Sequence, residues 1–299
     1  MNGIGFIGLG VMGLPMATNL LQKSKKRIIG FDVFENRRRI FEDNGGLSVA
    51  DSNEIYKSCD LIFLCLPTNE LVESSVKDII ATGRKNIIIV DLSSTSPSVI
   101  RNLYSLALFN EIGLIDSPVS GGEAGAIAGT LVLMCGGNKK IFDVVQPLLL
   151  TMGTTATYMG DTGCGCVAKL ANNMIVGCNI GAVSEAFAFA VKYGLDPETL
   201  YLAIKDGFAG SAVLNSKAPK IISQDFSPSA RVAVHQKDLK NAVQLAESMN
   251  VQIPLTNQVL DYMNILEAQG RVNEDHCAIA RVYEDAMGVK IAKINDIIE

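Results

Sequence analysis

Apolar and polar residues follow two different patterns along the chain, and the change falls near residue 160. Before it, short apolar runs typical of buried strands alternate with segments whose apolar residues recur at helical spacing. The apolar runs are residues 4–7, 27–31, 61–66, 87–91, 113–117, 131–135 and 155–159, with helical segments between them such as 70–81 and 97–108. This alternation predicts a parallel sheet covered by helices on both faces.

After Gly163 the strand pattern stops and helical spacing continues. A long apolar run from 166 to about 193 carries only Lys169, Glu185 and Lys192 as charges. A helix this apolar is expected to pack between domains or against another subunit, which favours a homo-oligomer, either a dimer or a tetramer. We therefore expect an α/β domain over 1–162 and an all-α domain over 163–299, with 163–193 as a long interdomain helix. The further helices are predicted at 197–205, 211–222, 234–249, 255–269 and 275–286.

The first strand leads into a glycine-rich turn that opens a helix ending at about residue 23. Gly8 permits a tight turn, Gly10 lets the backbone approach a pyrophosphate, and Gly13 lets the helix pack closely on the strand. The free N–H groups at the helix start would hold the phosphate charge. The pattern predicts a Rossmann-type dinucleotide-binding domain, with a purely structural turn as the alternative. The cofactor-binding residues predicted in this loop are Gly8, Leu9, Gly10, Val11, Met12 and Gly13.

The second predicted strand ends on Asp32, which bears on the choice of cofactor. A carboxylate there is placed to accept hydrogen bonds from the adenosine ribose hydroxyls and would repel a 2′-phosphate. NAD is therefore favoured over NADP. Three consecutive arginines at 37–39 keep NADP possible, because one guanidinium could pair with a phosphate. The other interpretation of these arginines is the solvated face of the second helix.

Composition narrows the class of protein. The chain has 299 residues, enough for two domains, and its 48% hydrophobic and 19% charged residues are typical of a well-packed protein. The net charge of −5, without a long basic tract, gives no indication of nucleic-acid binding. We expect no signal peptide and no uncharged apolar run long enough to span a bilayer, which predicts a cytoplasmic protein that binds no membrane.

Cysteines and histidines do not form a recognisable site in the sequence. The seven cysteines include no CxxC pair, which indicates buried reduced thiols. Cys164 and Cys166 could in principle bind a metal, but no histidine or second cysteine pair lies nearby, so no metal site is expected. His235 and His276 are isolated from any Ser/Asp or Cys arrangement, and a structural role is expected for both.

Lys169 is the most conspicuous charged residue of the long apolar run. Asn173 follows four residues later, on the same helix face. An ammonium group desolvated by apolar surroundings exchanges its proton more readily, and reduction of a carbonyl requires such a donor. The amide of Asn173 could orient the lysine or bind substrate. The alternative is a lysine that extends along the helix to reach solvent.

A polar turn and a charged pair on a predicted helix are further candidates for the site. Ser120, Gly121 and Gly122 offer a hydroxyl and free backbone N–H groups, which suit a carboxylate, with a plain tight turn as the alternative. Lys237 and Asp238 interrupt the apolar face of a predicted helix. Either residue could face a cleft or lie on a solvated surface.

With these residues the chain resembles the β-hydroxyacid dehydrogenases, the family of 3-hydroxyisobutyrate dehydrogenase and 2-hydroxy-3-oxopropionate (tartronate semialdehyde) reductase. The resemblance covers essentially the entire length. In the family the matching segments are the cofactor loop, the substrate-binding turn, the catalytic lysine helix and a site-facing lysine. In this chain they are residues 5–13, residues 116–122, the pattern Gly163-x-Gly165-x-x-x-Lys169-x-x-x-Asn173, and Lys237-Asp238.

The resemblance implies a mechanism and a set of roles. Hydride would pass between nicotinamide C4 and the carbon bearing the hydroxyl β to a carboxylate, with Lys169 as general acid/base beside Asn173. Backbone N–H groups and a cation would hold the carboxylate. The resemblance further implies that Leu66, Pro67, Thr95 and Lys237 contact the cofactor, and that Ser120, Gly121, Gly122, Lys169, Asn173 and Lys237 contact a small carboxylate substrate.

The substrate within the family stays open at this point. Segments 121–130, 209–219 and 275–284 look like the tartronate semialdehyde reductases, which favours tartronate semialdehyde and D-glycerate. Residues 31–34 look more like the NAD-using 3-hydroxyisobutyrate enzymes. Outside the class, the rival is a regulatory dinucleotide-binding protein without turnover, against which Lys169 beside Asn173 argues. Cys164 and Cys166 depart from the usual pattern and make the lysine loop oxidisable.

Overall fold

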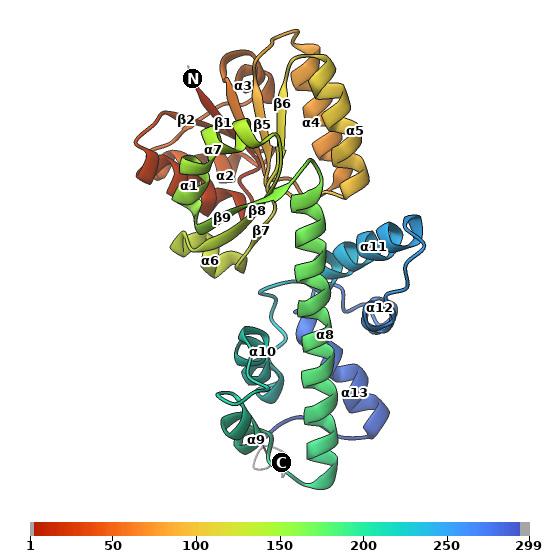
Figure 1. The fold of residues 1–299 in the computed structure, drawn as a ribbon. Helices are drawn as coiled ribbons and strands as arrows, with labels where there is room; N and C mark the ends of the chain where they lie inside the picture. Colours follow the sequence, from red (N-terminus) through yellow and green to blue (C-terminus); the bar gives the residue numbers. More distant parts are fainter. Residues whose placement is uncertain (1–2, 294–299) are drawn as a thin grey trace. The chain divides into compact units, whose positions relative to one another are not determined.

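The computed structural model describes residues 3–293 (Figure 1). The chain divides into two compact units, Met1–Lys169 (unit 1) and Leu170–Glu299 (unit 2). The division falls inside one long helix, α8 (Cys164–Tyr193). The domain boundary expected from the sequence, after residue 162, stays a prediction about where the folding domains meet.

Unit 1 contains a nine-stranded sheet in the order β3-β2-β1-β4-β5-β6-β8-β7, with β9 also paired to β8. The order reverses direction between β1 and β4, and ligands bind such sheets in the crevice beyond the carboxyl ends of the strands at this point. The strands are β1 (Ile4–Ile7), β2 (Ile28–Phe31), β3 (Leu47–Ser48), β4 (Leu61–Leu64), β5 (Ile88–Asp91), β6 (Gly113–Asp116), β7 (Val119–Ser120), β8 (Leu131–Gly137) and β9 (Gly153–Gly160).

The sheet is parallel from β3 to β6, as the alternating pattern predicts, but not throughout. Strand β8 pairs antiparallel with both β6 and β7. The expectation of a wholly parallel sheet was therefore wrong at this edge. The short β7 and the seven-residue helix α6 (Gly122–Ala128) reverse the chain there, and two-residue strands such as β3 and β7 leave no apolar run to detect.

Helices cover both faces of this sheet (Figure 1). One layer holds α1 (Gly13–Ser24), α2 (Glu35–Asp43) and α7 (Lys139–Met152). The other holds α3 (Ser52–Ser58), α4 (Asn69–Ala81) and α5 (Pro97–Phe109). Every residue of β1 and β4 is buried, as expected of central strands with helices on both sides. The structure thus confirms the predicted Rossmann-type α/β fold of this part of the chain.

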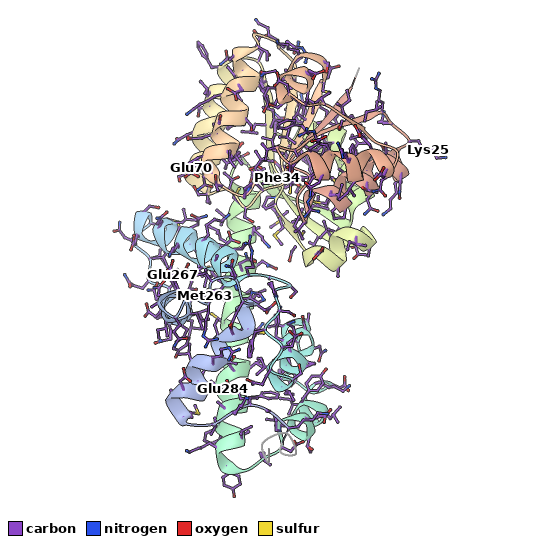
Figure 2. All side chains as sticks on the ribbon, turned by 180° about the vertical axis from the view of Figure 1, so that it is seen from behind. Lys25, Phe34, Glu70, Met263, Glu267 and Glu284 are labelled. Atoms are coloured by element: carbon purple, nitrogen blue, oxygen red, sulfur yellow. The ribbon has the colours of Figure 1, made fainter. Side chains whose placement is uncertain are left out.

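Unit 2 is built from helices around its own apolar core, which includes Ile180, Phe187, Leu239 and Met263; Met263 is labelled in Figure 2. Several helices begin where capping residues stand: the Asp196 side chain accepts a backbone N–H of α9, and Ser211 does the same for α10. Beyond α8, the helices are α9 (Pro197–Ile204), α10 (Ala212–Ile222), α11 (Val232–Ser248), α12 (Pro254–Ala268), the 3₁₀ turn η1 (His276–Ala278) and α13 (Ile279–Met287). The predicted all-α second half is confirmed.

Helix α8 is 30 residues long and unusually apolar. Within residues 3–293 it is the one helix that could cross a membrane by length and composition alone, with a mean hydropathy of 1.7 over its most apolar window. The expectation concerned an uncharged run, and between Lys169 and Glu185 the uncharged stretch covers only residues 170–184, shorter than the roughly 20 residues that span a bilayer. This helix is weak evidence for a membrane, since the core helix of a soluble protein passes the same test.

Candidate active site

The three glycines after β1 differ in what surrounds them. A Cβ on Gly8 would lie 2.2 Å from the carbonyl oxygen of Cys65, and one on Gly13 would lie 1.9 Å from that of Gly8. The chain's own packing therefore requires both. A Cβ on Gly10 would meet no heavy atom within 4 Å. Gly10 thus leaves open space beside the loop, which fits the close approach of a dinucleotide pyrophosphate.

The start of α1 also fits an anionic group. Its N-cap residue, Met12, provides no side-chain hydrogen bond, and the first turn contains no acidic residue. Backbone N–H groups at such a helix start, together with the helix dipole, attract phosphate. The loop therefore combines open space with positive electrostatic potential.

Asp32 links the end of β2 to the glycine loop. Its Oδ2 accepts a hydrogen bond of 2.7 Å from the Leu9 N–H, and its Oδ1 accepts one of 2.9 Å from the Phe34 N–H. Each carboxylate oxygen has a second lone pair with which to accept a ribose hydroxyl. Asp32 is 8% exposed, so it can both hold the loop and bind the sugar. Phe34, beside it in the chain, is exposed on unit 1 (Figure 2).

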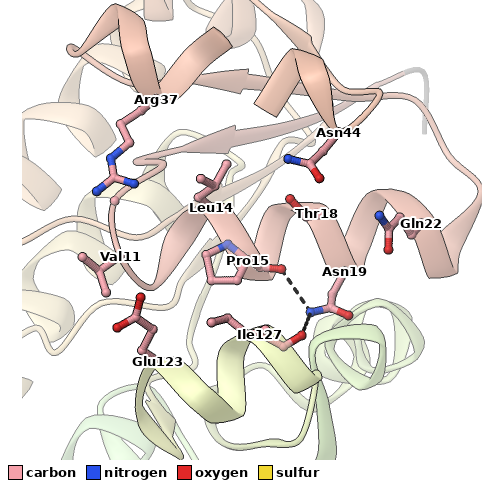
Figure 3. Close-up of a pocket in the computed structure, with 11 residues that line it drawn as sticks. Val11, Leu14, Pro15, Thr18, Asn19, Gln22, Arg37, Asn44, Glu123 and Ile127 are labelled. Carbon is pink, nitrogen blue, oxygen red and sulfur yellow. Dashed lines mark hydrogen bonds between the residues drawn. The ribbon is translucent and has the colours of Figure 1, made fainter. Parts of the chain in front are cut away.

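The arginines at 37–39 have three different surroundings. Arg38 donates to the Asp32 carbonyl oxygen at 2.6 Å, and Arg39 pairs with Glu35 at the same distance. Arg37 lines a cavity of about 320 Å³ that begins at the glycine loop (Figure 3). Of the three, Arg37 is the one whose side chain borders open space next to the predicted cofactor loop. The lining residues are Gly10, Val11, Leu14, Pro15, Thr18, Asn19, Gln22, Arg37, Asn44, Glu123 and Ile127.

The loops after β4 and β5 hold three predicted cofactor residues. The Leu66 N–H donates to the Ser93 hydroxyl at 2.9 Å, which joins the two loops, and the Thr95 hydroxyl donates to Asp91. Pro67 is exposed beside them. Burial raises the pKa of the Asp91 carboxyl to about 6, while hydrogen bonds from Ser93 and Thr95 oppose that rise. The structure therefore brings Leu66 and Thr95 to the carboxyl edge of the sheet.

Asp116 anchors the helix that carries Lys169. This carboxylate is fully buried at the end of β6; its Oδ1 accepts the Gly163 N–H at 2.8 Å and its Oδ2 accepts the Cys166 N–H at 2.9 Å. A Cβ on Gly165 would lie 2.3 Å from the Met134 carbonyl oxygen. The glycines before Lys169 thus allow α8 to begin directly against the sheet. Lys169 is half-buried about one turn beyond this anchor.

The two cysteines of this loop differ in burial, with Cys164 half-buried and Cys166 buried. Cys166 is 2% exposed, and burial together with the nearby carboxylates of Asp116 and Asp91 raises its pKa well above the usual range. A buried thiol that keeps its proton resists oxidation. The burial of Cys166 argues against its oxidation, and an oxidisable loop stays a prediction for half-buried Cys164. Across residues 3–293, no group of three His, Cys, Asp or Glu side chains could hold a metal ion.

The predicted carboxylate cradle is a turn of two glycines with positive φ. Ser120 ends β7, and Gly121 and Gly122 follow with φ of 136° and 64°. A Cβ on Gly122 would meet nothing within 4 Å, so the backbone faces open space there. Successive N–H groups in such a turn can bind an anion. Residues 120–122 thus form a tight turn whose backbone N–H groups could also bind a carboxylate.

Unit 2 brings Asn173 and Lys237 together through Asp238. The Asn173 Nδ2 donates to Asp238 Oδ2 at 2.6 Å, and Lys237 Nζ lies 3.5 Å from Asp238 Oδ1. Asn172 donates to Asn173 Oδ1 at 3.0 Å. Asp238 is 2% exposed, so this carboxylate holds both predicted site residues from inside the unit.

Three buried carboxylates play supporting roles that were not predicted, although Asp116 lies in the 116–122 segment and Asp238 was a candidate to face a cleft. Asp91, Asp116 and Asp238 each hold a predicted site residue or the element that carries it. For the first two a signal exists in the sequence, because each ends an apolar strand at the binding edge of a parallel sheet. For Asp238 the only signal is its place beside Lys237.

Family models match both parts of the chain. Residues 3–160 match the model described as the NAD binding domain of 6-phosphogluconate dehydrogenase. Residues 163–283 match the one described as NAD-binding of NADP-dependent 3-hydroxyisobutyrate dehydrogenase.

Individual relatives match over nearly their full lengths. The 2-hydroxy-3-oxopropionate reductase of Escherichia coli (strain K12) is 36% identical, covering 97% of this chain and 99% of that protein. The 2-(hydroxymethyl)glutarate dehydrogenase of Eubacterium barkeri is 34% identical, covering 97% of each. A structure of Mycobacterium tuberculosis 3-hydroxyisobutyrate dehydrogenase with L-serine superimposes with a TM-score of 0.86 at 28% identity, covering 94% of this chain and 99% of that one.

These matches confirm the family that the motifs indicated. The loop geometry at Gly10 and Asp32 fits the NAD(P) that this family uses, and the two relatives above, at 34% and 36% identity, are named a dehydrogenase and a reductase. The chain therefore belongs to the β-hydroxyacid dehydrogenase family and is an NAD(P)-dependent oxidoreductase.

Proposed function

We propose that this enzyme interconverts tartronate semialdehyde and D-glycerate with NAD(H). The observation that carries the proposal is the construction of α8: Asp116 fixes its start, Lys169 lies about one turn on, and Asn173 lies one turn further, held by Asp238. The named relative at 36% identity supports this substrate, as do segments 121–130, 209–219 and 275–284.

In the proposed reaction the dinucleotide supplies or accepts the hydride at the substrate carbon. Lys169 donates a proton to the carbonyl oxygen during reduction and takes the hydroxyl proton during oxidation. The Asn173 amide orients the reacting oxygen, because its Nδ2 is fixed by Asp238 and keeps a second N–H to donate. Ser120 and the N–H groups of Gly121 and Gly122 hold the carboxylate, with Lys237 as the cation.

We further propose that NAD is preferred to NADP. The Asp32 carboxylate accepts two backbone N–H groups and keeps lone pairs for ribose hydroxyls, whereas a 2′-phosphate would meet its negative charge. Arg37 and the Arg38 guanidinium lie near enough in the chain to weaken this preference. The ratio of kcat/KM values for the two cofactors measures it, and equal values would overturn it.

A substrate panel tests the proposed activity. D-glycerate, 3-hydroxyisobutyrate, 3-hydroxypropionate, L-serine and 2-(hydroxymethyl)glutarate are oxidised with NAD and with NADP, and kcat/KM is compared. We expect D-glycerate to give the highest value. If 3-hydroxyisobutyrate were the best substrate, the alternative that residues 31–34 and the Mycobacterium tuberculosis structure favour would replace the proposal.

The role of Lys169 is tested separately from the substrate. Lys169→Ala should lower kcat by about 10²–10⁴-fold, the usual contribution of a general acid/base, and leave the Kd for NAD within about twofold. Lys192→Ala, at the far end of the same helix, is the matched control and should keep wild-type turnover. Unchanged kcat in Lys169→Ala would remove the proposed role, and loss of turnover without loss of NAD binding would also disfavour a regulatory protein that does not catalyse.

We also propose a homo-oligomer in the cytoplasm that binds neither membrane nor nucleic acid. On α8 the apolar residues Ile175, Phe189 and Tyr193 are 63%, 69% and 85% exposed, which a second copy of the chain would relieve. Sedimentation velocity at micromolar concentration gives the mass of the assembly. A monomer in solution would contradict the first part of this proposal, and recovery of the enzyme with cell membranes would contradict the second.

A further inference from the structure

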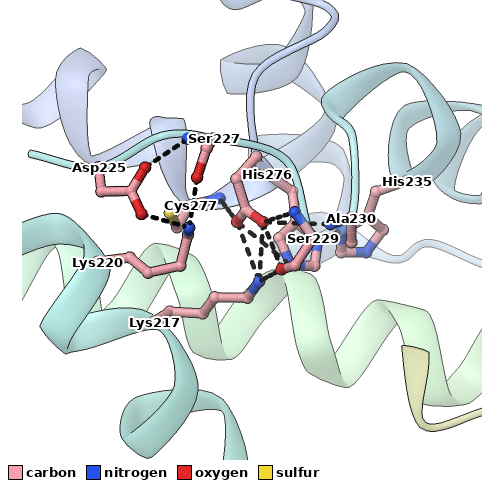
Figure 4. Close-up of polar contacts among 10 residues, drawn as sticks. Lys217, Lys220, Asp225, Ser227, Ser229, Ala230, His235, His276 and Cys277 are labelled. Carbon is pink, nitrogen blue, oxygen red and sulfur yellow. Dashed lines mark hydrogen bonds and ion pairs between the residues drawn. The ribbon is translucent and has the colours of Figure 1, made fainter. Parts of the chain in front are cut away.

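The two histidines of the chain, for which the sequence predicts a structural role, form one hydrogen-bonded pair in unit 2 (Figure 4). Their Nδ1 atoms lie 2.8 Å apart, with His235 on α11 and His276 in η1. Both side chains are buried, at 4% and 6% exposure. The other ring nitrogen of His235, Nε2, lies 2.9 Å from the backbone carbonyl oxygen of Asn173.

The partners decide where the protons are. A carbonyl oxygen can only accept, so His235 Nε2 carries a hydrogen and donates to Asn173. The two Nδ1 atoms then share one hydrogen, which His276 donates to His235. On the far side, His276 Nε2 lies 3.9 Å from Asp275 Oδ1.

The far end of the pair is a rigid support. Asp275 is fully buried and pairs with Lys217 at 3.0 Å, and it also accepts the Ser229 hydroxyl at 2.7 Å. Burial opposes its ionisation, but the charges of His276 and Lys217 help to hold the pKa of this carboxyl well below its usual range. His276 therefore stands against a carboxylate that is charged at neutral pH and held by several hydrogen bonds.

The near end shows that α8 is shaped to receive the His235 ring. A Cβ on Gly177 would lie 3.4 Å from both Cε1 and Nε2 of His235 and 3.1 Å from Val259 Cγ1. In a helix the Gly177 N–H donates to the Asn173 carbonyl, so that oxygen accepts from the helix and from the imidazole with its two lone pairs. The missing side chain at 177 gives the ring room to reach it.

We propose that His235 and His276 are positioning residues that fix Asn173 for catalysis. Asn173 is held at its backbone by His235 and at its amide by Asp238, so its remaining N–H points in one direction. Without the imidazole, this turn of α8 loses its side-chain contact at the backbone, and the contacts of Asp238 and Asn172 with the Asn173 amide remain. The proposal rests on the proposed function, in which Asn173 orients the reacting oxygen.

The pair itself is tested in the wild-type holoenzyme by ¹⁵N NMR after labelling of histidine. With two histidines the spectrum holds four ring-nitrogen signals. We expect a hydrogen on His235 Nε2 and a scalar coupling between the two Nδ1 nuclei across their hydrogen bond. Two independent imidazoles with no such coupling would overturn the proposal, whatever the enzyme's substrate.

The effect on Asn173 is tested with two variants of one residue. His235→Phe keeps the ring's shape but donates nothing, whereas the amide of His235→Gln can reach the Nε2 position and donate. We expect kcat for the best β-hydroxy acid to fall about tenfold in His235→Phe and to recover to within about threefold in His235→Gln, with the KM for NAD unchanged within about twofold. The same loss in both variants, or no loss in either, would overturn the proposal.

A double-variant cycle separates positioning from stability. If His235 acts through Asn173, then adding His235→Phe to Asn173→Ala should lower kcat no further. Multiplying effects would show that the histidine acts elsewhere and would overturn the proposal. If no β-hydroxy acid were turned over, the proposed function would fail, and the positioning of Asn173 would be tested by NMR instead. The signals of the Asn173 side-chain amide should shift in His235→Phe and return to their wild-type positions in His235→Gln.

Discussion

The two units hold their candidate site residues in different ways. In unit 1 the cofactor loop is shaped by the absence of side chains at Gly8 and Gly13, where any Cβ would collide with a carbonyl oxygen. In unit 2 Asn173 is held by hydrogen bonds with two side chains buried on another helix, His235 and Asp238 of α11. A side chain added to the loop should therefore disrupt it. The group formed by Asn173, Asp238, His235 and His276, called here the Asn173 cluster, should instead be disrupted when a polar side chain is removed.

The largest loss of stability is expected when the buried carboxylate of Asp275 in unit 2 is removed. Asp275→Ala would leave the Lys217 ammonium buried without its partner, which costs about 3–5 kcal/mol of the free energy of unfolding. Urea denaturation measures this loss. The exposed pair of Lys205 with Asp206 is the control, since Asp206→Ala should change stability by less than about 1 kcal/mol.

Asp275 also gives this unit a dependence on acid. Its pKa is lowered in the folded state, so its stabilising contribution is complete above the unfolded value near about 3.9 and is lost as the pH falls through the lower folded value. Stability measured between neutral pH and pH 2 should fall less steeply in Asp275→Asn than in the wild type. Parallel curves for the two proteins would show that this carboxyl titrates as it does in the unfolded chain.

In unit 1, two glycines of the cofactor loop separate the effect on stability from the effect on NAD binding. Gly13→Ala should lose about 1–3 kcal/mol of unfolding free energy, because its Cβ would lie 1.9 Å from the Gly8 carbonyl oxygen. Gly10→Ala should stay within about 0.5 kcal/mol of the wild type and yet bind NAD at least tenfold more weakly, because its Cβ would enter the space kept for the pyrophosphate. If Gly10→Ala bound NAD as the wild type does, this space would not belong to the cofactor.

The smallest effect is expected at Gly177, where unit 2 uses a missing side chain as unit 1 does. Gly177→Ala should displace Val259, whose Cγ1 would lie 3.1 Å from the new Cβ, crowd the His235 ring at 3.4 Å, and lower kcat about two- to threefold. Gly181→Ala is the matched control on the same helix, because its Cβ would make only an ordinary contact of 3.6 Å with Val259. Equal kcat in the two variants would remove the steric part of the argument.

The features of unit 1 that depend on neighbouring residues could be predicted from the sequence, whereas features that depend on distant residues could not. Gly8, Gly13 and Asp32 are recognisable because strand, turn and helix lie next to one another along the chain, and each residue answers a local steric or electrostatic need. Strand β8 pairs antiparallel with β6, and no local pattern carries that information. The reversal depends on α6, whose seven residues are too few to show a clear helical period.

The Asn173 cluster lies beyond such reasoning for a different reason. Its contacts join residue 173 to residues 235 and 238, and residue 235 to residue 276, so each partner looks like an isolated polar residue in the sequence. The periodicity of α11 shows which face is apolar. It does not show that buried His235 and Asp238 on that helix meet the same residue of α8.

Because Lys169 and Asn173 stand on one unbroken helix, the geometry of the helix fixes the distance and the angle between their positions on it. A helix advances about 100° per residue, so inserting or deleting a single residue between 169 and 173 would turn one of the two away from the other while leaving both in the chain. Members of a lineage that keep this chemistry should accept length changes in their loops and substitutions along most of the helix, but no change in the count of residues across this one turn.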